Sequence, residues 1–186
     1  MLTQLAERIG AELNKSVAVE CSGFEAIPKD YRRLVKDITV QAVRNAMVHG
    51  IEDGAVRRSM GKPETGAIAI EFQALPGGFK LTIEDDGQGI STDRIKEVAV
   101  QKRMISADQA AAMDAKQAFS LLFQAGFSMA ERETKDAGRG VGMNLIAERA
   151  REAGGRVGVA TAPGKFTRIS VSLPPTNKRI NVTEAA

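Results

Sequence analysis

A row of polar side chains with ligand-binding chemistry lies on the predicted central helix of residues 30–50. Asp37, Gln41, Asn45 and His49 are four residues apart, so they line up along one side of the helix. Helix faces that only meet water usually carry Lys and Glu, whereas Asn is a mediocre residue in mid-helix and is commoner at caps and turns. The row therefore indicates a ligand site, and the alternative is a hydrated face that contains an Asn by chance.

A carboxylate and two glycines follow the second strand of a predicted hairpin. The spacing of Asp85, Gly87 and Gly89 lets the backbone pass close to a flat ligand. The Asp85 carboxylate can then accept a hydrogen bond from an exocyclic amine, such as that of adenine. Asp and Gly are also the commonest turn residues, so an ordinary turn is the alternative.

A second glycine cluster, at Gly138, Gly140 and Gly142, opens a predicted helix. The free N–H groups and the positive dipole end of a helix N-terminus favour an anion. The cluster lacks the Gly-Lys-Ser/Thr ending of a P-loop, and it does not directly follow a strand as a dinucleotide-binding glycine run does. It therefore predicts either a phosphate site or a flexible entry to the helix.

The elements that position these residues follow from the periodicity of the apolar residues. Alternation predicts strands over 17–21, 67–75, 79–84, 156–160 and 166–173, with the hairpin turn at 76–78. Helical spacing predicts helices over 2–13, 30–50, 92–102 (capped by Thr92 or Asp93), 117–124 and 140–150, a helical turn at 55–60, and a short helix capped by Ser106 or Asp108. On the central helix, the residues that should face the core are Leu34, Val35, Ile38, Val43, Met47 and Ile51.

These elements predict a single domain over residues 1–173, to which residues 1–29 contribute the first helix and strand. Residues 127–139 have no apolar period and predict a mobile loop, and residues 174–186 predict a C-terminal tail or linker.

Composition excludes several classes of function. The chain has 186 residues, a net charge of +3, one Tyr and no Trp, so it offers neither a strong basic patch nor aromatic platforms for nucleic acid. It lacks a membrane-spanning apolar run and a secretory signal pattern at its N-terminus. The single Cys21 cannot form an internal disulfide, and no Cys/His spacing indicates zinc. We expect a cytoplasmic protein with no membrane insertion and no nucleic-acid partner.

Taken together and in chain order, these features resemble the GHKL ATP-binding domains of histidine kinases, Hsp90-type chaperones, gyrases and MutL. The resemblance is strongest to the ATP-binding catalytic domain of CheA-type chemotaxis histidine kinases. The matching stretches are Val43–Glu52, Gly61–Gly66, Asp85–Gly89, Phe123–Ala130, Gly138–Met143 and Gly154–Val157. The resemblance implies a Bergerat-type fold, an α/β two-layer sandwich in which a mixed sheet packs on helices. ATP would lie between these helices and a flexible lid that includes Phe127, Ser128 and Thr134.

The resemblance also implies roles for individual residues. Asn45 would coordinate Mg²⁺ on the ATP phosphates, and Asp85 would bind the adenine amino group with Gly87 and Gly89 giving the base room. The remaining nucleotide contacts would come from the phosphate-side residues Arg44, His49, Ser128, Thr134, Gly138, Arg139, Gly140, Gly142 and Met143. A basic residue common in the family is replaced by Val98, and Lys96 or Lys102 would substitute for it.

The position of the family's general base is the clearest departure. The residue four before Asn45 is usually His or Glu, and here it is Gln41, whose amide cannot take a proton and can only orient a group by hydrogen bonding. Losing a general base typically slows a reaction by about 10²–10⁴-fold, which leaves nucleotide binding intact.

His49 is the only histidine in the chain, so a phospho-accepting histidine would have to be presented in trans. The resemblance then implies a protein histidine kinase domain that uses Mg²⁺ and ATP and acts on a histidine-phosphotransfer domain, with further kinase domains or response regulators as other partners. This piece is expected to be a monomer. The alternatives are a weakened, nucleotide-binding regulatory module and another ATPase or serine kinase of the same superfamily.

Overall fold

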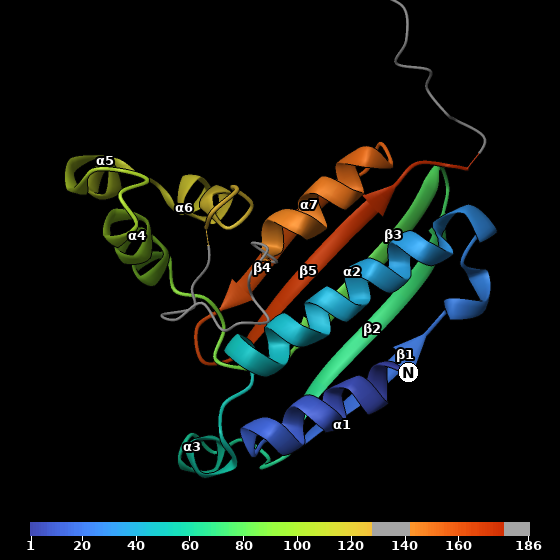
Figure 1. Cartoon of the computed structure of the whole chain (residues 1–186), viewed down its shortest axis with the longest axis horizontal. Coiled ribbons are helices and arrows are strands. Elements are labelled where there is room, and N and C mark those ends of the chain that lie inside the picture. The colour runs from blue at the N-terminus through green and yellow to red at the C-terminus, as the bar shows by residue number, and fades with distance from the viewer. Residues whose placement is uncertain (128–141, 177–186) are drawn as a thin grey trace, which may run out of the picture.

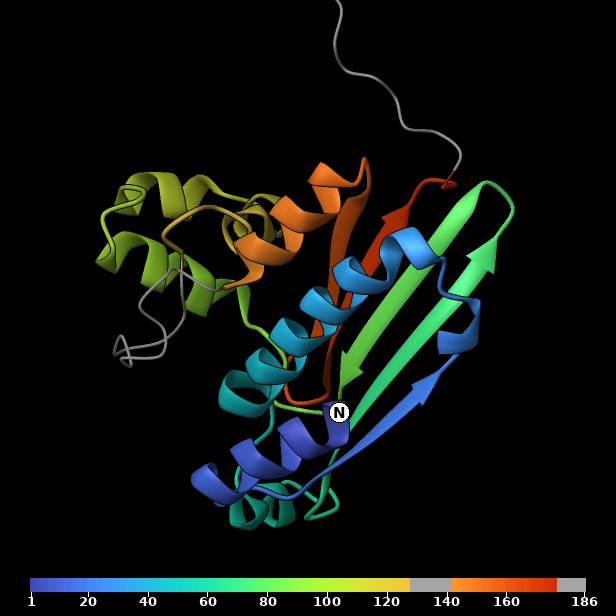
Figure 2. The ribbon, with the colours of Figure 1, turned by 45° about the vertical axis from the view of Figure 1, so that its right-hand side comes forward.

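The computed structural model describes residues 1–127 and 142–176, which form a mixed sheet of five strands with helices packed on one face (Figure 1, Figure 2). The strands are β1 (Val17–Ser22), β2 (Gly66–Leu75), β3 (Gly78–Asp85), β4 (Arg156–Ala162) and β5 (Phe166–Leu173). Their order across the sheet is β1-β2-β3-β5-β4, with β1 parallel to β2 and the other neighbouring pairs antiparallel. This architecture confirms the predicted α/β sandwich.

Three helices cover the same face of the sheet: α1 (Leu2–Leu13), α2 (Arg32–Asn45) and α7 (Met143–Glu152) (Figure 1). The strands alternate, so that Ile68, Ile70 and Phe72 of β2 are buried under these helices while Ala69 and Glu71 are exposed on the other face. Burying each large apolar side chain stabilises the fold by about 1.5–3 kcal/mol. The main core is the layer between the sheet and these three helices.

A smaller core lies to one side of the sheet, away from α1 (Figure 1, Figure 2). Its helices are α4 (Thr92–Gln101), α5 (Ala107–Ala112) and α6 (Ala115–Leu121). Phe127, predicted to belong to a lid, is buried in this cluster.

The central helix differs from its prediction at both ends. A 3₁₀ turn, η2 (Lys29–Tyr31), precedes α2, and a π-helical turn, η3 (Ala46–Gly50), follows it. The Ile51 amide closes the π turn by donating to the Ala46 carbonyl at 2.7 Å. The predicted core face is confirmed, because Val35, Ile38, Val43, Met47 and Ile51 are buried and Leu34 packs against the core half-buried.

Other boundaries shift because of local capping. Ser91, extended at ψ 133°, is the N-cap of α4 in place of the predicted Thr92 or Asp93, and Ser106 caps α5 with a full capping box. The helix predicted over 117–124 is α6, which starts at Ala115 because Asp114 accepts from the Gln117 amide, and it ends at Leu121. The helix predicted over 140–150 corresponds to α7, which begins at Met143 and ends at Glu152.

Two further short elements lie within the described residues. They are η1 (Phe24–Ala26) and α3 (Gly54–Ser59), and α3 overlaps the predicted helical turn. The predicted loop beyond Phe127 and the tail beyond residue 176 lie outside the described residues. None of the helices within 1–127 and 142–176 combines the length and apolar character needed to span a membrane.

Candidate functional site

Asp85 is the last residue of β3 and lies beneath the end of the central helix. Its side chain is buried, and its Oδ1 accepts a hydrogen bond from the Gly87 amide at 3.1 Å. Burial raises the pKa of Asp85 to about 6, against the Gly87 hydrogen bond, and the Asp86 and Glu52 carboxylates add to the rise. A buried carboxylate that still ionises near neutral pH is suited to accepting a ligand's N–H donor.

The glycines at positions 50 and 87 let two backbone segments approach Asp85 closely. A Cβ on Gly87 would lie 2.2 Å from the Gly50 carbonyl oxygen and 2.7 Å from Asp85 Oδ1, and one on Gly50 would lie 2.9 Å from Asp85 Oδ1. Gly89 adopts a left-handed φ of +68°, and a Cβ there would lie 2.3 Å from the Ala162 carbonyl oxygen. Gly50 and Gly87 thus form a cradle at Asp85, whereas Gly89 packs against the β4–β5 hairpin.

Two residues of the predicted polar row are in direct contact. Gln41 is buried, and its Nε2 donates to Oδ1 of the half-buried Asn45 at 3.0 Å. An amide oxygen has two lone pairs, so Asn45 Oδ1 retains the capacity for a second partner such as a metal ion. Gln41 therefore orients the oxygen that was predicted to face Mg²⁺.

Arg44 near the end of α2 and His49 in the π turn are both exposed to solvent. The backbone of the π turn is joined to the loop after β3 that holds Gly87 and Gly89, here called the glycine loop. Gln88 Nε2 donates to the His49 carbonyl at 2.6 Å, and the Gln88 amide donates to the Gly50 carbonyl at 2.9 Å. Partial loss of hydration, and then the Lys15 ammonium, lower the pKa of His49, so its imidazole is neutral at pH 7.

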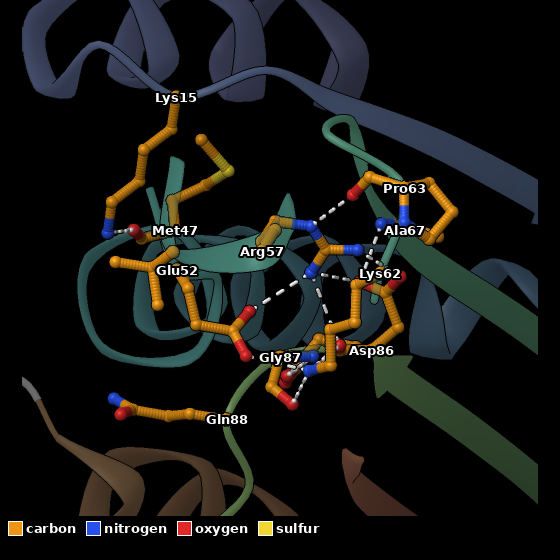
Figure 3. A network of polar contacts seen from close by, with 12 residues as sticks. Lys15, Met47, Glu52, Arg57, Lys62, Pro63, Ala67, Asp86, Gly87 and Gln88 are labelled. Atoms are coloured by element: carbon orange, nitrogen blue, oxygen red, sulfur yellow. Dashed lines mark hydrogen bonds and ion pairs between the residues drawn. The ribbon is translucent and has the colours of Figure 1, made fainter. Parts of the chain in front are cut away.

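Sequence reasoning missed a cluster of four charged side chains behind this loop (Figure 3). Arg57 on α3 is fully buried and pairs with Glu52 at 3.0 Å and with Asp86 at 2.7 Å. Lys62 pairs with the same Glu52 at 2.7 Å. Burial alone would raise the pKa of Glu52, but the hydrogen bonds from Lys62 and Arg57 hold it below its ordinary value. Glu52, Lys62 and Asp86 lay in stretches that matched the family (Val43–Glu52, Gly61–Gly66 and Asp85–Gly89), but Arg57 lay in none of them.

The other predicted site residues divide into two groups. Gly142 caps the N-terminus of α7, and Met143 begins that helix with its side chain packed against both cores; Lys102 at the end of α4 is exposed. Ser128, Thr134, Gly138, Arg139 and Gly140 lie outside the described residues. Within the described part of the chain, no three His, Cys, Asp or Glu side chains gather as a metal cluster.

Comparisons with known proteins agree on one family. The family described as histidine kinase-, DNA gyrase B-, and HSP90-like ATPase matches residues 30–177. The gliding motility regulatory protein of Myxococcus xanthus is 37% identical over 140 residues, which cover 75% of this chain and 18% of that protein. The chemotaxis protein CheA of Bacillus subtilis is 30% identical over 180 residues, 96% of this chain and 27% of that protein.

The chain thus spans 18% and 27% of the lengths of these two relatives. Among solved structures, the histidine kinase domain of the Erythrobacter litoralis blue-light activated histidine kinase has a TM-score of 0.48 at 14% identity, covering 93% of this chain and 58% of that one.

The packing role of Gly89 is testable against a matched glycine. Gly61 has a similar φ of +73°, and a Cβ added there would meet nothing within 4 Å, so Gly61→Ala should lower the free energy of unfolding by only about 1–2 kcal/mol, the cost of the left-handed backbone. Gly89→Ala should lower it by a further ~1–3 kcal/mol, because the Ala162 carbonyl must move. Urea unfolding measures both, and equal losses would contradict the packing role.

Proposed function

The chain belongs to the histidine kinase-, DNA gyrase B-, and HSP90-like ATPase family, and from this premise we propose that it is the ATP-binding catalytic domain of a chemotaxis-type histidine kinase. The observation that carries the proposal is the buried Asp85 carboxylate in its glycine cradle. A buried carboxylate that glycine backbone approaches closely supports recognition of the polar edge of a base.

Adenine recognition is proposed for Asp85. Its carboxylate would accept a hydrogen bond from the exocyclic amine, and the low dielectric of a buried site strengthens such a bond. The close backbone approach at Gly50 and Gly87 supports this role, since any side chain at either position would meet the carboxylate. Gly89 would act indirectly, by holding the loop against the β4–β5 hairpin.

The phosphates are proposed to lie toward the start of α7 and the end of α2. Mg²⁺ bound to them would neutralise their charge, and Asn45 Oδ1, oriented by Gln41, fits the oxygen ligands that this ion prefers. The amides at the start of α7, from the N-cap Gly142 and from Met143, would donate to phosphate oxygens, that of Gly142 in exchange for its bond to Asn144 Oδ1 at 3.3 Å. The other proposed contacts are Arg44, His49, Lys102, Ser128, Thr134, Gly138, Arg139 and Gly140.

The reaction proposed is transfer of the γ-phosphoryl group to a histidine on a separate domain or protein. The bond from phosphorus to the β-phosphate oxygen breaks, a phosphorus–nitrogen bond to the imidazole forms, and the imidazole proton leaves to solvent. Positioning and charge neutralisation would supply most of the catalysis. Gln41 cannot accept the proton, so it would contribute only by orienting Asn45. The same substitution favours the second candidate, a nucleotide-binding module that regulates without transferring phosphate.

Nucleotide binding should depend on Asn45 only through the metal. We expect Asn45→Ala to weaken binding of Mg·ATP by about tenfold or more and to leave metal-free ATP binding nearly unchanged, because the lost oxygen is a metal ligand. Titration calorimetry with and without Mg²⁺ makes the comparison. Equal losses under both conditions would contradict a metal-binding role, and absence of ATP binding by the unaltered chain would refute the proposed function.

Phosphoryl transfer should respond to a base at position 41. Gln41→His should accelerate transfer from ATP to a histidine-phosphotransfer domain by roughly 10²–10⁴-fold, while Gln41→Leu, which restores no base, should not. The assay follows the label of γ-³²P-ATP on the acceptor. Binding without transfer in every variant would favour the regulatory module.

A further inference from the structure

The charge cluster of Arg57, Lys62, Glu52 and Asp86, in which the Arg57 side chain is fully buried and that of Asp86 is 37% exposed, is attached to the glycine loop through the backbone as well as through side chains (Figure 3). Lys62 Nζ donates to the Asp86 carbonyl at 2.8 Å and to the Gly87 carbonyl at 2.8 Å. Arg57 Nη1 also reaches the Asp86 carbonyl, at 3.3 Å. Two cations are therefore directed at one peptide group of the loop.

The peptide group between Asp86 and Gly87 also contacts Asp85, through its N–H. Its carbonyl belongs to Asp86 and its N–H to Gly87, and this N–H donates to Asp85 Oδ1 at 3.1 Å. Because a trans peptide is planar, its C=O and N–H point in opposite directions, so fixing the carbonyl fixes the direction of the N–H. A cation on the carbonyl also polarises the peptide and strengthens the N–H as a donor.

Several further hydrogen bonds hold the cluster in place. The Asp86 carboxylate accepts from both Arg57 terminal nitrogens, at 3.2 and 2.7 Å, and from the Ala67 amide of β2 at 2.8 Å. The guanidinium is anchored further by Nε, which donates to the Pro63 carbonyl at 2.7 Å. The Arg57 side chain is completely buried and that of Lys62 is 15% exposed, so water screens their interactions weakly.

We propose that Lys62 and Arg57 are positioning residues for nucleotide recognition, which hold the Asp86–Gly87 peptide so that its N–H keeps the Asp85 carboxylate aimed at the adenine amino group. This inference rests on the proposed function of Asp85. Neither cation touches the nucleotide in this arrangement; each acts through the peptide.

The charges facing Asp85 give the proposal an electrostatic signature. Asp86 beside it and Glu52 after the π turn favour its protonated form, and Lys62 favours its ionised form. The residues opposite Asp85 on the neighbouring strands, Ile68 and Thr167, carry no charge. Removing the Lys62 ammonium therefore shifts the Asp85 pKa upward, so that the carboxylate is protonated at higher pH.

The test compares Mg·ATP affinity between pH 5.5 and 8.5 for the unaltered chain, Lys62→Met and Lys62→Arg. Lys29→Met serves as the matched control, because it removes the same charge from an exposed lysine outside the site. We expect Lys62→Met to bind about tenfold more weakly at pH 7.5, as losses of outer supporting groups typically do. As the pH is lowered, its affinity should begin to fall at a higher pH than that of the unaltered chain. Lys62→Arg should restore both the affinity and the pH profile. Thermal unfolding, measured alongside, reports the structural cost of each change.

The outcomes separate this inference from the proposed function. ATP binding by the unaltered chain with the same affinity and pH profile in Lys62→Met would overturn the positioning role. A loss of thermal stability with no shift of the pH profile would also overturn it, because it would leave the cluster a purely structural part. No ATP binding by the unaltered chain at any pH would instead refute the proposed function. The ionisation of ATP itself is common to all variants and drops out of the comparison.

Discussion

The close approach of the Gly50 and Gly87 backbones at the Asp85 carboxylate is the constraint on which the rest of the site depends. A Cβ on Gly87 would lie 2.2 Å from the Gly50 carbonyl oxygen, so only glycine lets the π turn and the loop after β3 meet there. The Gln88 amide then donates to the Gly50 carbonyl, which joins the two segments. In this way the helix with Asn45 and the strand with Asp85 keep one fixed relation.

The charge cluster stabilises this junction from behind. Taking Arg57 and its partners out of water is expensive, and buried ion pairs are often no more stabilising than apolar residues of the same volume. Here each Arg57 nitrogen has an oxygen partner, which offsets the cost of burial. Arg57 and Lys62 direct hydrogen bonds to particular backbone carbonyls, whereas apolar side chains in the same place could fill the volume but could not fix the direction of a carbonyl.

Periodicity predicted the strands, the main helices and the core face of α2, whereas the packing of a mixed sheet on helices was implied by the family resemblance. The π turn could not be predicted, since the apolar residues Val43, Met47 and Ile51 fit an ordinary helix equally well. The burial of Arg57 could not be predicted either. Its charged partners lie 5 and 29 residues away in the sequence, and a basic residue in a short helical turn normally points to solvent. Of the predicted site, the placement of Gln41 and Asn45 on one side of the helix and the position of Asp85 at a strand end could be checked in the fold. The roles toward ATP rest on family membership and remain proposals.

The pKa of Asp85 with and without nucleotide is the most direct test of adenine recognition by this carboxylate. Carbon-13 NMR of the labelled Asp carboxyls, assigned by the signal missing in Asp85→Asn, follows its titration in the free chain and at saturating Mg·ADP. A nucleotide that binds the ionised carboxylate must lower its pKa by linkage. If Asp85 binds the adenine amino group, its pKa is about 6 in the free chain and lower in the complex. Tight nucleotide binding with an unchanged Asp85 titration would contradict this role of Asp85.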